Sequence, residues 1–431
     1  MSEDRPLTYA DKSFPPSAWG RSSADLAADG VKLSAFETPV FTLDSAAMDR
    51  NVARMARWVG ERGLDLAPHG KTTMAPDLWR RQLDAGAWGI TLATGWQVQV
   101  ARQFGTERIL LANTLVDPVA LTWISGELDA HPDFEFFCWA DSVEALERME
   151  DVLGPLRPTR PVNVLVDLGA AGGRTGARSV EQALAVARRI SASTVLSLAG
   201  AGGYEGSLAH DRRESGLARV GSYLDSVVAL HRALIDEGLY NTSSAVITAG
   251  GSAYFDSVAD RLGVVVDRAG ERGIPTRVVL RSGAYMIHDD GFYRDVSPFG
   301  RAASEGMELE AAMHCWARVL SRPEPGLAIF DAGRRDVPFD EGLPIPQRVV
   351  GYSEPESERM LAGSEVTKLN DQHGYLSLPA PAGPEVLTVG SVIRFGLSHP
   401  CTAMDKWRAV PLINDAHAAD PTVVGAVRTY F

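Results

Sequence analysis

The first side chain with chemical potential is Lys71, which lies in the short segment 67–72 (APHGKT) directly after an apolar run. A lysine amine that loses its proton can attack a carbonyl carbon and form a Schiff base. The ordinary alternative for an isolated lysine is a solvated surface residue. The position of the lysine distinguishes these two interpretations, because a Schiff-base lysine is expected at the mouth of a barrel, where a strand ends.

Two turns have the composition of an anion-binding nest. One contains Gly250, Gly251 and Ser252, and the other contains Ser282 and Gly283. Successive backbone N–H groups in such turns can point at one anion, although glycine is common in loops and neither turn is specific by itself. A reactive lysine together with a phosphate nest describes the two ends of one pyridoxal phosphate molecule.

Four more side chains stand at or shortly after the ends of apolar runs: His69, Arg174, Tyr204 and Tyr285. Arg174 could hydrogen-bond the pyridine nitrogen or the phenolic oxygen of the cofactor, and Tyr204 could pack beside its ring. A loop charge and a core aromatic are the ordinary alternatives. All four are candidate cofactor-binding residues.

A second constellation, His399 and Cys401, follows a late apolar run. In an extended segment, residues i and i+2 point to the same side, so the two side chains would project together. Imidazole and thiolate favour Zn²⁺, with Mn²⁺ as the alternative metal. Catalytic zinc usually has three protein ligands, and Asp405 is the candidate for the third. The alternative to a metal site is a buried cysteine beside a surface histidine, with no ligand between them.

The elements that must position these residues follow a regular pattern of short apolar runs alternating with segments of helical period. Such alternation predicts a parallel sheet, and eight runs are the number that closes a (β/α)₈ barrel, whose active residues lie at the carboxyl ends of the strands. An open doubly wound sheet is the alternative. The runs are 64–69, 89–93, 108–112, 134–139, 162–168, 195–199, 245–248 and 277–280.

Domain boundaries follow from where this pattern changes. We expect the cofactor-binding barrel over residues 36–300 and a mostly antiparallel β domain over 301–431 that carries the metal motif, with residues 1–35 packing on it. Asp44 is the expected N-cap of the helix that follows.

Composition limits the class of protein. The chain has 431 residues, 45% of them hydrophobic, and a net charge of −13, which would repel nucleic acid. No run approaches the roughly 18 apolar residues of a membrane span, and the polar first residues do not resemble a signal peptide. Three cysteines are too few for a disulfide framework, so a cytoplasmic location is expected.

Together, residues 68–72, the Gly-Gly-Ser turn, residues 281–285 and residues 399–402 resemble the fold-type III pyridoxal-phosphate enzymes. The branch that the sequence resembles is the metal-dependent D-serine dehydratases and D-threonine aldolases, and within it the bacterial cryptic D-serine dehydratase (D-serine deaminase) group. The resemblance covers residues 36–431.

This resemblance implies an alanine-racemase-like barrel with a β domain, in homodimers whose subunits both shape the active site. It implies that Lys71 forms the Schiff base, that His399 and Cys401 bind zinc, and that D-serine becomes pyruvate and ammonia. Two departures matter. Ala67 stands where the family often has arginine, and Cys401 stands where the aldolases usually have aspartate, which favours the dehydratase.

Other activities stay open. Retro-aldol cleavage of a D-3-hydroxy amino acid, as in D-threonine aldolase, uses the same cofactor, and so does dehydration of D-threo-3-hydroxyaspartate. A non-catalytic pyridoxal-phosphate-binding protein would share the barrel and the lysine but usually lacks a second domain. A racemase would need a second base opposite Lys71, from Tyr285 or from the partner subunit.

Overall fold

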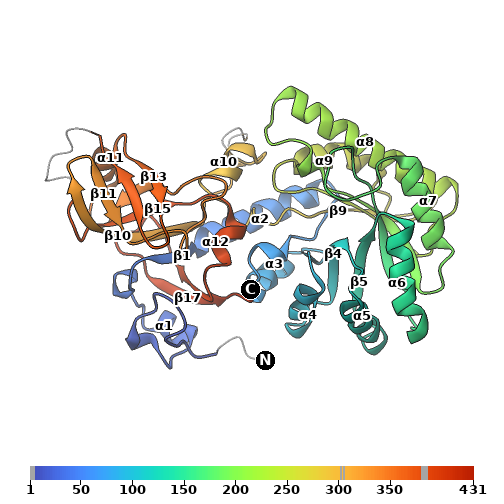
Figure 1. Ribbon diagram of the computed structural model, residues 1–431, viewed down its shortest axis with the longest axis horizontal. Coiled ribbons are helices and arrows are strands. Elements are labelled where there is room, and N and C mark those ends of the chain that lie inside the picture. The colour runs from blue at the N-terminus through green and yellow to red at the C-terminus, as the bar shows by residue number, and fades with distance from the viewer. Residues whose placement is uncertain (1–4, 301–302, 304–305, 380–386) are drawn as a thin grey trace. The chain divides into compact units, whose positions relative to one another are not determined.

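The computed structural model describes residues 5–300, 303, 306–379 and 387–431 (Figure 1). Its contacts divide the chain into two compact units. The barrel unit comprises residues 55–71 and 81–283, and the sheet unit comprises residues 1–54, 72–80 and 284–431. Among the described residues, every helix is too short or too polar to cross a bilayer.

The barrel unit contains eight parallel strands in the order β2-β9-β8-β7-β6-β5-β4-β3. Trp88 N donates to Leu66 O at 2.7 Å and Thr91 N donates to Pro68 O at 2.9 Å, so the last edge returns to the first. The predicted barrel is therefore confirmed. The strands are β2 (Asp65–Leu66), β3 (Ile90–Leu92), β4 (Arg108–Thr114), β5 (Glu135–Ala140), β6 (Val162–Asp167), β7 (Leu196–Gly202), β8 (Ala245–Ala249) and β9 (Thr276–Leu280).

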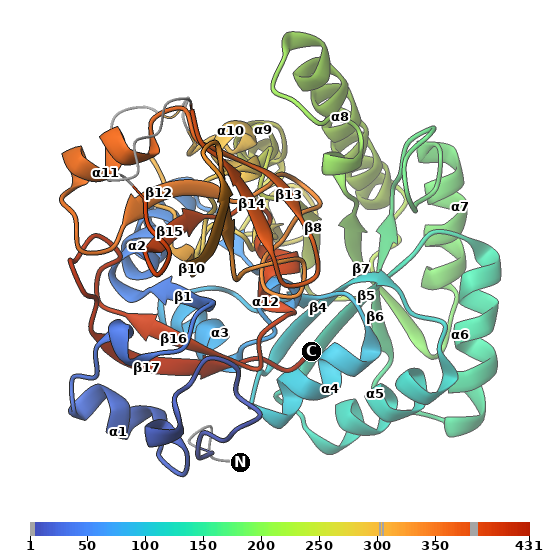
Figure 2. The same ribbon diagram turned by 60° about the vertical axis from the view of Figure 1, so that its left-hand side comes forward.

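Helices cover the outer side of these strands, as Figures 1 and 2 show for α4 to α8. Strands covered on both faces must be apolar throughout, and β7 and β8 are buried at every position. Hydroxyl caps at Thr94, Ser142 and Ser179 start three of the helices. The helices are α4 (Gly95–Gln103), α5 (Pro118–Ala130), α6 (Val143–Leu156), α7 (Val180–Ser191), α8 (Glu214–Asp236) and α9 (Phe255–Leu262).

The sheet unit contains a nine-stranded sheet whose pairs are antiparallel except for β1 with β16, as predicted for a mostly antiparallel domain. β1, which comes from the beginning of the chain, is an interior strand of this sheet because it pairs with β10 on one side and β16 on the other. The strands are β1 (Val40–Asp44), β10 (Met313–Glu324), β11 (Leu327–Phe330), β12 (Ile345–Val349), β13 (Glu365–Leu369), β14 (Gly374–Ser377), β15 (Val392–Gly396), β16 (Ala409–Ile413) and β17 (Val423–Arg428).

The remaining helices are short, apart from α2, and connect these strands or extend from them. They are α1 (Ser23–Ala28), α2 (Ser45–Glu61), α3 (Pro76–Asp84), α10 (Phe292–Val296), α11 (Glu354–Leu361) and α12 (Pro400–Met404).

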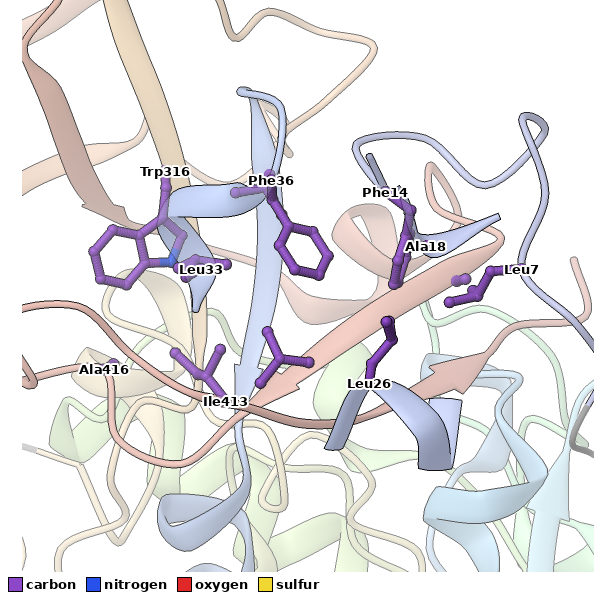
Figure 3. Close-up of a cluster of buried hydrophobic side chains, with 12 residues drawn as sticks. Leu7, Phe14, Ala18, Leu26, Leu33, Phe36, Trp316, Ile413 and Ala416 are labelled. Carbon is purple, nitrogen blue, oxygen red and sulfur yellow. The ribbon is translucent and has the colours of Figure 1, made fainter. Parts of the chain in front are cut away.

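The N-terminal segment packs into a hydrophobic cluster of the sheet unit (Figure 3). Leu7, Phe14 and Leu26 lie there with Trp316 and Ile413 from strands β10 and β16. Apolar burial of this kind contributes about 25 cal/mol per Å². Residues far apart in the sequence thus share one core.

The predicted boundary at 300/301 adjoins residues 301–302, which lie outside the described residues.

Asp44 links the two ends of the sheet unit, and it is the N-cap of α2, as predicted. Its side chain is buried, with Oδ1 accepting from Ala47 N at 2.9 Å and Oδ2 accepting from Ala416 N at 2.8 Å. Asp44→Ala leaves two buried donors without acceptors and should lower the free energy of unfolding by about 2–4 kcal/mol. Denaturant titration measures this. Asp44→Asn, which keeps one acceptor oxygen, should lose less, and equal stability of all three proteins would contradict the assignment.

Candidate active site

Lys71 lies in a single 3-10 turn (Gly70–Thr72) that follows β2 at the carboxyl end of the strand. Its side chain is half-buried, unlike a solvated surface lysine. The amine lies close enough to His69 to lower the pKa of that imidazole. The chain therefore places a cation and a histidine side by side where barrel enzymes hold their reacting groups.

His69 is a neutral imidazole at the same place. Desolvation holds its pKa well below the usual value, and the charges of Lys71, Arg281 and Arg174 lower it further. Its Nδ1 is buried and has no hydrogen-bond partner among the described residues. Gly283 backs the histidine closely, because a Cβ there would lie 2.7 Å from His69 Cβ. Glycine at 283 is thus required by close approach.

The Gly-Gly-Ser turn is held by a carboxylate that the sequence analysis did not identify. Glu205, fully buried after β7, accepts from Gly250 N at 3.0 Å and from Gly251 N at 2.7 Å. Ser282 Oγ donates to Gly251 O at 3.0 Å from the neighbouring turn. The N–H groups of Gly250 and Gly251, which were expected to face a phosphate, therefore face the carboxylate of Glu205. The next residue, Ser252, is half-buried.

A buried arginine fills the space between the strand ends. Arg281 is 1% exposed, and its guanidinium donates to Thr248 Oγ1 at 2.7 Å and to Gly203 O at 2.6 Å. It also lies over the Trp139 ring, 4.9 Å from the centroid. Desolvation lowers its pKa, which still leaves a guanidinium charged. Its position within the predicted motif was known from the sequence, but not its burial.

The structure also brings together two of the predicted cofactor residues. The Arg174 guanidinium lies 4.8 Å from the centre of the Tyr204 ring, and Tyr204 in turn packs against Gly251, where a Cβ would lie 3.0 Å from the ring. Arg174 is exposed, as a group that must reach a ligand can be. Tyr285 differs from these residues, because it is buried in the sheet unit.

Unsatisfied polar atoms mark this end of the barrel as fit for a polar ligand. Buried polar groups nearly always have partners, and yet at this end of the barrel five polar atoms have none among the described residues. All five residues lie at or just beyond the carboxyl ends of strands, after β2, at the end of β4, near the end of β5, at the end of β6 and after β9. The atoms are His69 Nδ1, Thr114 Oγ1, Trp139 Nε1, Asp167 Oδ2 and Arg281 Nε. Together with Lys71 and Arg174, this set suits a compact heteroaromatic phosphate such as pyridoxal phosphate.

The metal motif lies in the sheet unit, with a geometry different from the expected one. Residues 399–401 are not extended: Pro400 begins α12, as proline favours at the first helical position, and His399 has φ 44° and ψ 86°. The two side chains nevertheless meet. A hydrogen bond with Cys401 is the main cause that raises the pKa of His399 to about 9, with Asp340 as a further cause.

Further contacts fix this pair. His399 Nδ1 lies 2.6 Å from Asp340 Oδ2, and Cys401 Sγ lies 3.4 Å from the hydroxyl of Thr72, the residue after Lys71 in the chain. Imidazole and thiolate in contact are a suitable donor set for zinc. Asp405, the candidate third ligand, is exposed and lies 3.3 Å from Lys406 Nζ. Over the described part of the chain, no cluster of three His, Cys, Asp or Glu residues forms a metal site.

Comparison with known proteins adds a chemical context. Residues 312–413 match the model of a putative serine dehydratase domain. The chain is 26% identical to a D-threonine aldolase of an Arthrobacter species, over 91% of this chain and 93% of that one. It is also 26% identical to the D-threo-3-hydroxyaspartate dehydratase of Delftia sp. strain HT23, over 92% of this chain and 97% of that one.

Solved structures share the fold. The D-threonine aldolase of Filomicrobium marinum superposes with a TM-score of 0.75 at 22% identity, covering 93% of this chain and 96% of that one. An alanine racemase of E. faecalis gives 0.54 at 15% identity, covering 85% and 92%. Structures of D-threo-3-hydroxyaspartate dehydratase include variants in which a histidine, or a cysteine two positions later, is replaced by alanine, the latter in a metal-free form.

The buried carboxyl group of Asp167 predicts a pH-dependent stability. Burial is the main cause that raises its pKa from 3.8 to about 6 in the folded protein. The folded state therefore holds its proton more tightly, and stability falls as the pH rises from about 4 to about 6. Asp167→Asn cannot ionise, so the variant should gain stability relative to the wild type over this window, by at most about 3 kcal/mol. Denaturant titrations of cofactor-free protein from pH 4 to 7 measure the difference. The exposed Asp133→Asn should show no such trend, and a constant difference for Asp167→Asn would refute the buried-acid assignment.

Proposed function

We propose that this chain, which belongs to the family of D-serine dehydratases and D-threonine aldolases among the fold-type III pyridoxal-phosphate enzymes, is a lyase that dehydrates a D-3-hydroxy amino acid. The observation that carries the proposal is the placement of His399 and Cys401 at the start of α12, where His399 Nδ1 lies 2.6 Å from Asp340 Oδ2 and Cys401 Sγ lies 3.4 Å from Thr72 Oγ1. The same pair of residue types, two positions apart, was replaced in the variants of D-threo-3-hydroxyaspartate dehydratase. Cysteine at 401 supports dehydration more than aldol cleavage, because the family resemblance implies aspartate at this position in the aldolases.

The substrate class follows from the relatives. They are named for D-threonine, 3-hydroxy-D-aspartate and D-threo-3-hydroxyaspartate, all of which carry a hydroxyl on Cβ. D-serine is the smallest member of this class. The relatives favour D-threo-3-hydroxyaspartate, or a similar amino acid with a substituent on Cβ, over D-serine as the substrate. D-serine belongs to the same proposed substrate class.

Pyridoxal phosphate, when bound, supplies an electron sink that stabilises negative charge at Cα. Lys71 would hold the cofactor covalently and, once substrate takes its place, accept the Cα proton with its free amine. Arg174 would bond the pyridine nitrogen. The turns at Ser252 and Gly283 and the start of α9 would receive the phosphate, because the loops after the last barrel strands usually do so.

His399 and Cys401 would hold Zn²⁺ or Mn²⁺, whose Lewis acidity helps a hydroxide leave Cβ. The substrate then loses the Cα proton and the Cβ hydroxide as water, and hydrolysis of the product releases a keto acid and ammonia. The hydroxyl of Thr72, the residue after Lys71 in the chain, lies 3.4 Å from Cys401 Sγ. We propose a homodimer as the working assembly.

Retro-aldol cleavage is the second candidate, favoured by the likeness to two D-threonine aldolases. It breaks the Cα–Cβ bond and yields glycine and an aldehyde, whereas dehydration breaks the Cα–H and Cβ–O bonds. The two reactions therefore differ both in product and in the fate of the Cα hydrogen.

Incubation with D-threo-3-hydroxyaspartate, D-serine and D-threonine tests the proposal. We expect keto acid and ammonia from at least one of the three, with loss of deuterium from Cα-labelled substrate into water. The L-enantiomers serve as controls and should not react. Glycine as the main product, with the Cα label retained, would transfer the assignment to aldol cleavage.

Lys71→Ala tests the cofactor. Borohydride should fix pyridoxal phosphate to the wild type on the peptide that contains Lys71, as mass spectrometry can show. The variant should lose this link and its turnover but keep its melting temperature within a few degrees, because a half-buried rim lysine contributes little to the core. Lys32→Ala, a surface change, should behave as the wild type. Labelling at another lysine would contradict the role of Lys71.

A further inference from the structure

We propose that Asp340 is the positioning residue that orients His399 toward a bound divalent metal, and that Asp340 is not itself a ligand. The proposal rests on the metal site of the proposed function and adds the residue that prepares it. Asp340 lies 59 positions before His399 in the chain, in the loop between β11 and β12.

Both oxygens of Asp340 already have partners. Oδ2 lies 2.6 Å from His399 Nδ1, and Oδ1 accepts from Thr402 Oγ1 at 2.7 Å. An aspartate side chain that contacts an imidazole and a hydroxyl in this way is a carboxylate at neutral pH. An anionic acceptor at Nδ1 keeps the proton on that nitrogen, which leaves the lone pair on Nε2.

A metal would therefore bind on the opposite side of the ring. Nδ1 is engaged with Asp340, so Nε2 is the ring nitrogen left to face a metal. A carboxylate on the far nitrogen of a metal-binding histidine fixes the tautomer and orientation of the ring and raises the basicity of the binding nitrogen. Because Asp340 occupies the Nδ1 side with both oxygens engaged, it would have to break two hydrogen bonds to become a ligand.

The main chain of His399 is held as firmly as its ring. A non-glycine residue at φ 44° is uncommon and persists only where its surroundings hold it. His399 N donates to Asp289 Oδ2 at 3.1 Å, and Asp289 is fully buried, with Oδ1 accepting from Tyr293 N at 2.8 Å. One carboxylate thus fixes the backbone and another fixes the imidazole. The histidine is prepared for a metal before any metal binds.

The decisive measurement is the Zn²⁺ affinity of metal-stripped protein, titrated in competition with a chromophoric chelator. Asp340→Asn should weaken binding about 10- to 100-fold, the usual effect of removing an outer-shell partner. Glu341→Gln is the matched control, because it removes the same charge from the adjacent exposed residue, and it should bind as the wild type. The melting temperature of metal-free Asp340→Asn should match that of the control.

Further variants separate the outcomes. Thr402→Val frees Asp340 Oδ1 without touching the imidazole and should weaken Zn²⁺ binding several-fold, which keeps the test valid should Asp340→Asn fold poorly. With Co²⁺, both the near-ultraviolet thiolate-to-metal band and the visible d–d bands of Asp340→Asn should match those of the wild type. His399→Ala should bind far more weakly than any of these.

Three results would overturn the inference. If His399→Ala lost affinity while Asp340→Asn matched Glu341→Gln, the metal site would stand and the positioning role would fail. If Asp340→Asn were as weak as His399→Ala and its Co²⁺ spectrum showed a lost ligand, Asp340 would be a direct ligand. If His399→Ala bound Zn²⁺ like the wild type, the proposed metal site itself would fail, and the role of Asp340 with it.

Discussion

A buried cation organises the carboxyl end of the barrel. Burying a guanidinium is costly unless its N–H groups find acceptors. Two nitrogens of Arg281 find them on Thr248 Oγ1 and Gly203 O, and the guanidinium lies 4.9 Å from the centre of the Trp139 ring. These partners come from β8, from the segment after β7 and from β5. Because one side chain joins three strands, the turns that follow those strands have little freedom, and the groups they carry are held in place.

Carboxylates play a matching part at both candidate sites. Glu205 fixes two backbone N–H groups in the barrel unit, and Asp340 fixes an imidazole in the sheet unit. Asp340 contacts the histidine that would bind a metal, and Glu205 fixes the turn that leads to Ser252, where the phosphate would bind. Preorganisation of this kind costs stability in the empty protein but spares the ligand the cost of ordering its own site.

The sequence was sufficient for the barrel, because strands buried on both faces must be continuous apolar runs and therefore show in the pattern. It also brought out Lys71 and the pair His399 and Cys401 as candidates, because their residue types carry the chemistry. It could not reveal that β1 pairs with β10 and β16, or that Asp340 meets His399, since those contacts depend on chain folding over long separations. The helical turn that begins at Pro400 could not be predicted either. The preceding residue, His399, has a left-handed backbone conformation, and no glycine marks that position in the sequence.

The role of Glu205 changes what the glycines of the barrel mouth mean. Gly250 and Gly251 direct their N–H groups at an acid from the neighbouring loop, so the shape of the turn is dictated from outside it. A chain with both glycines but without the acid would lose the two hydrogen bonds that hold this turn, even though its Gly-Gly motif was unchanged. In this chain the acid after β7 and the paired glycines after β8 therefore act as one structural unit.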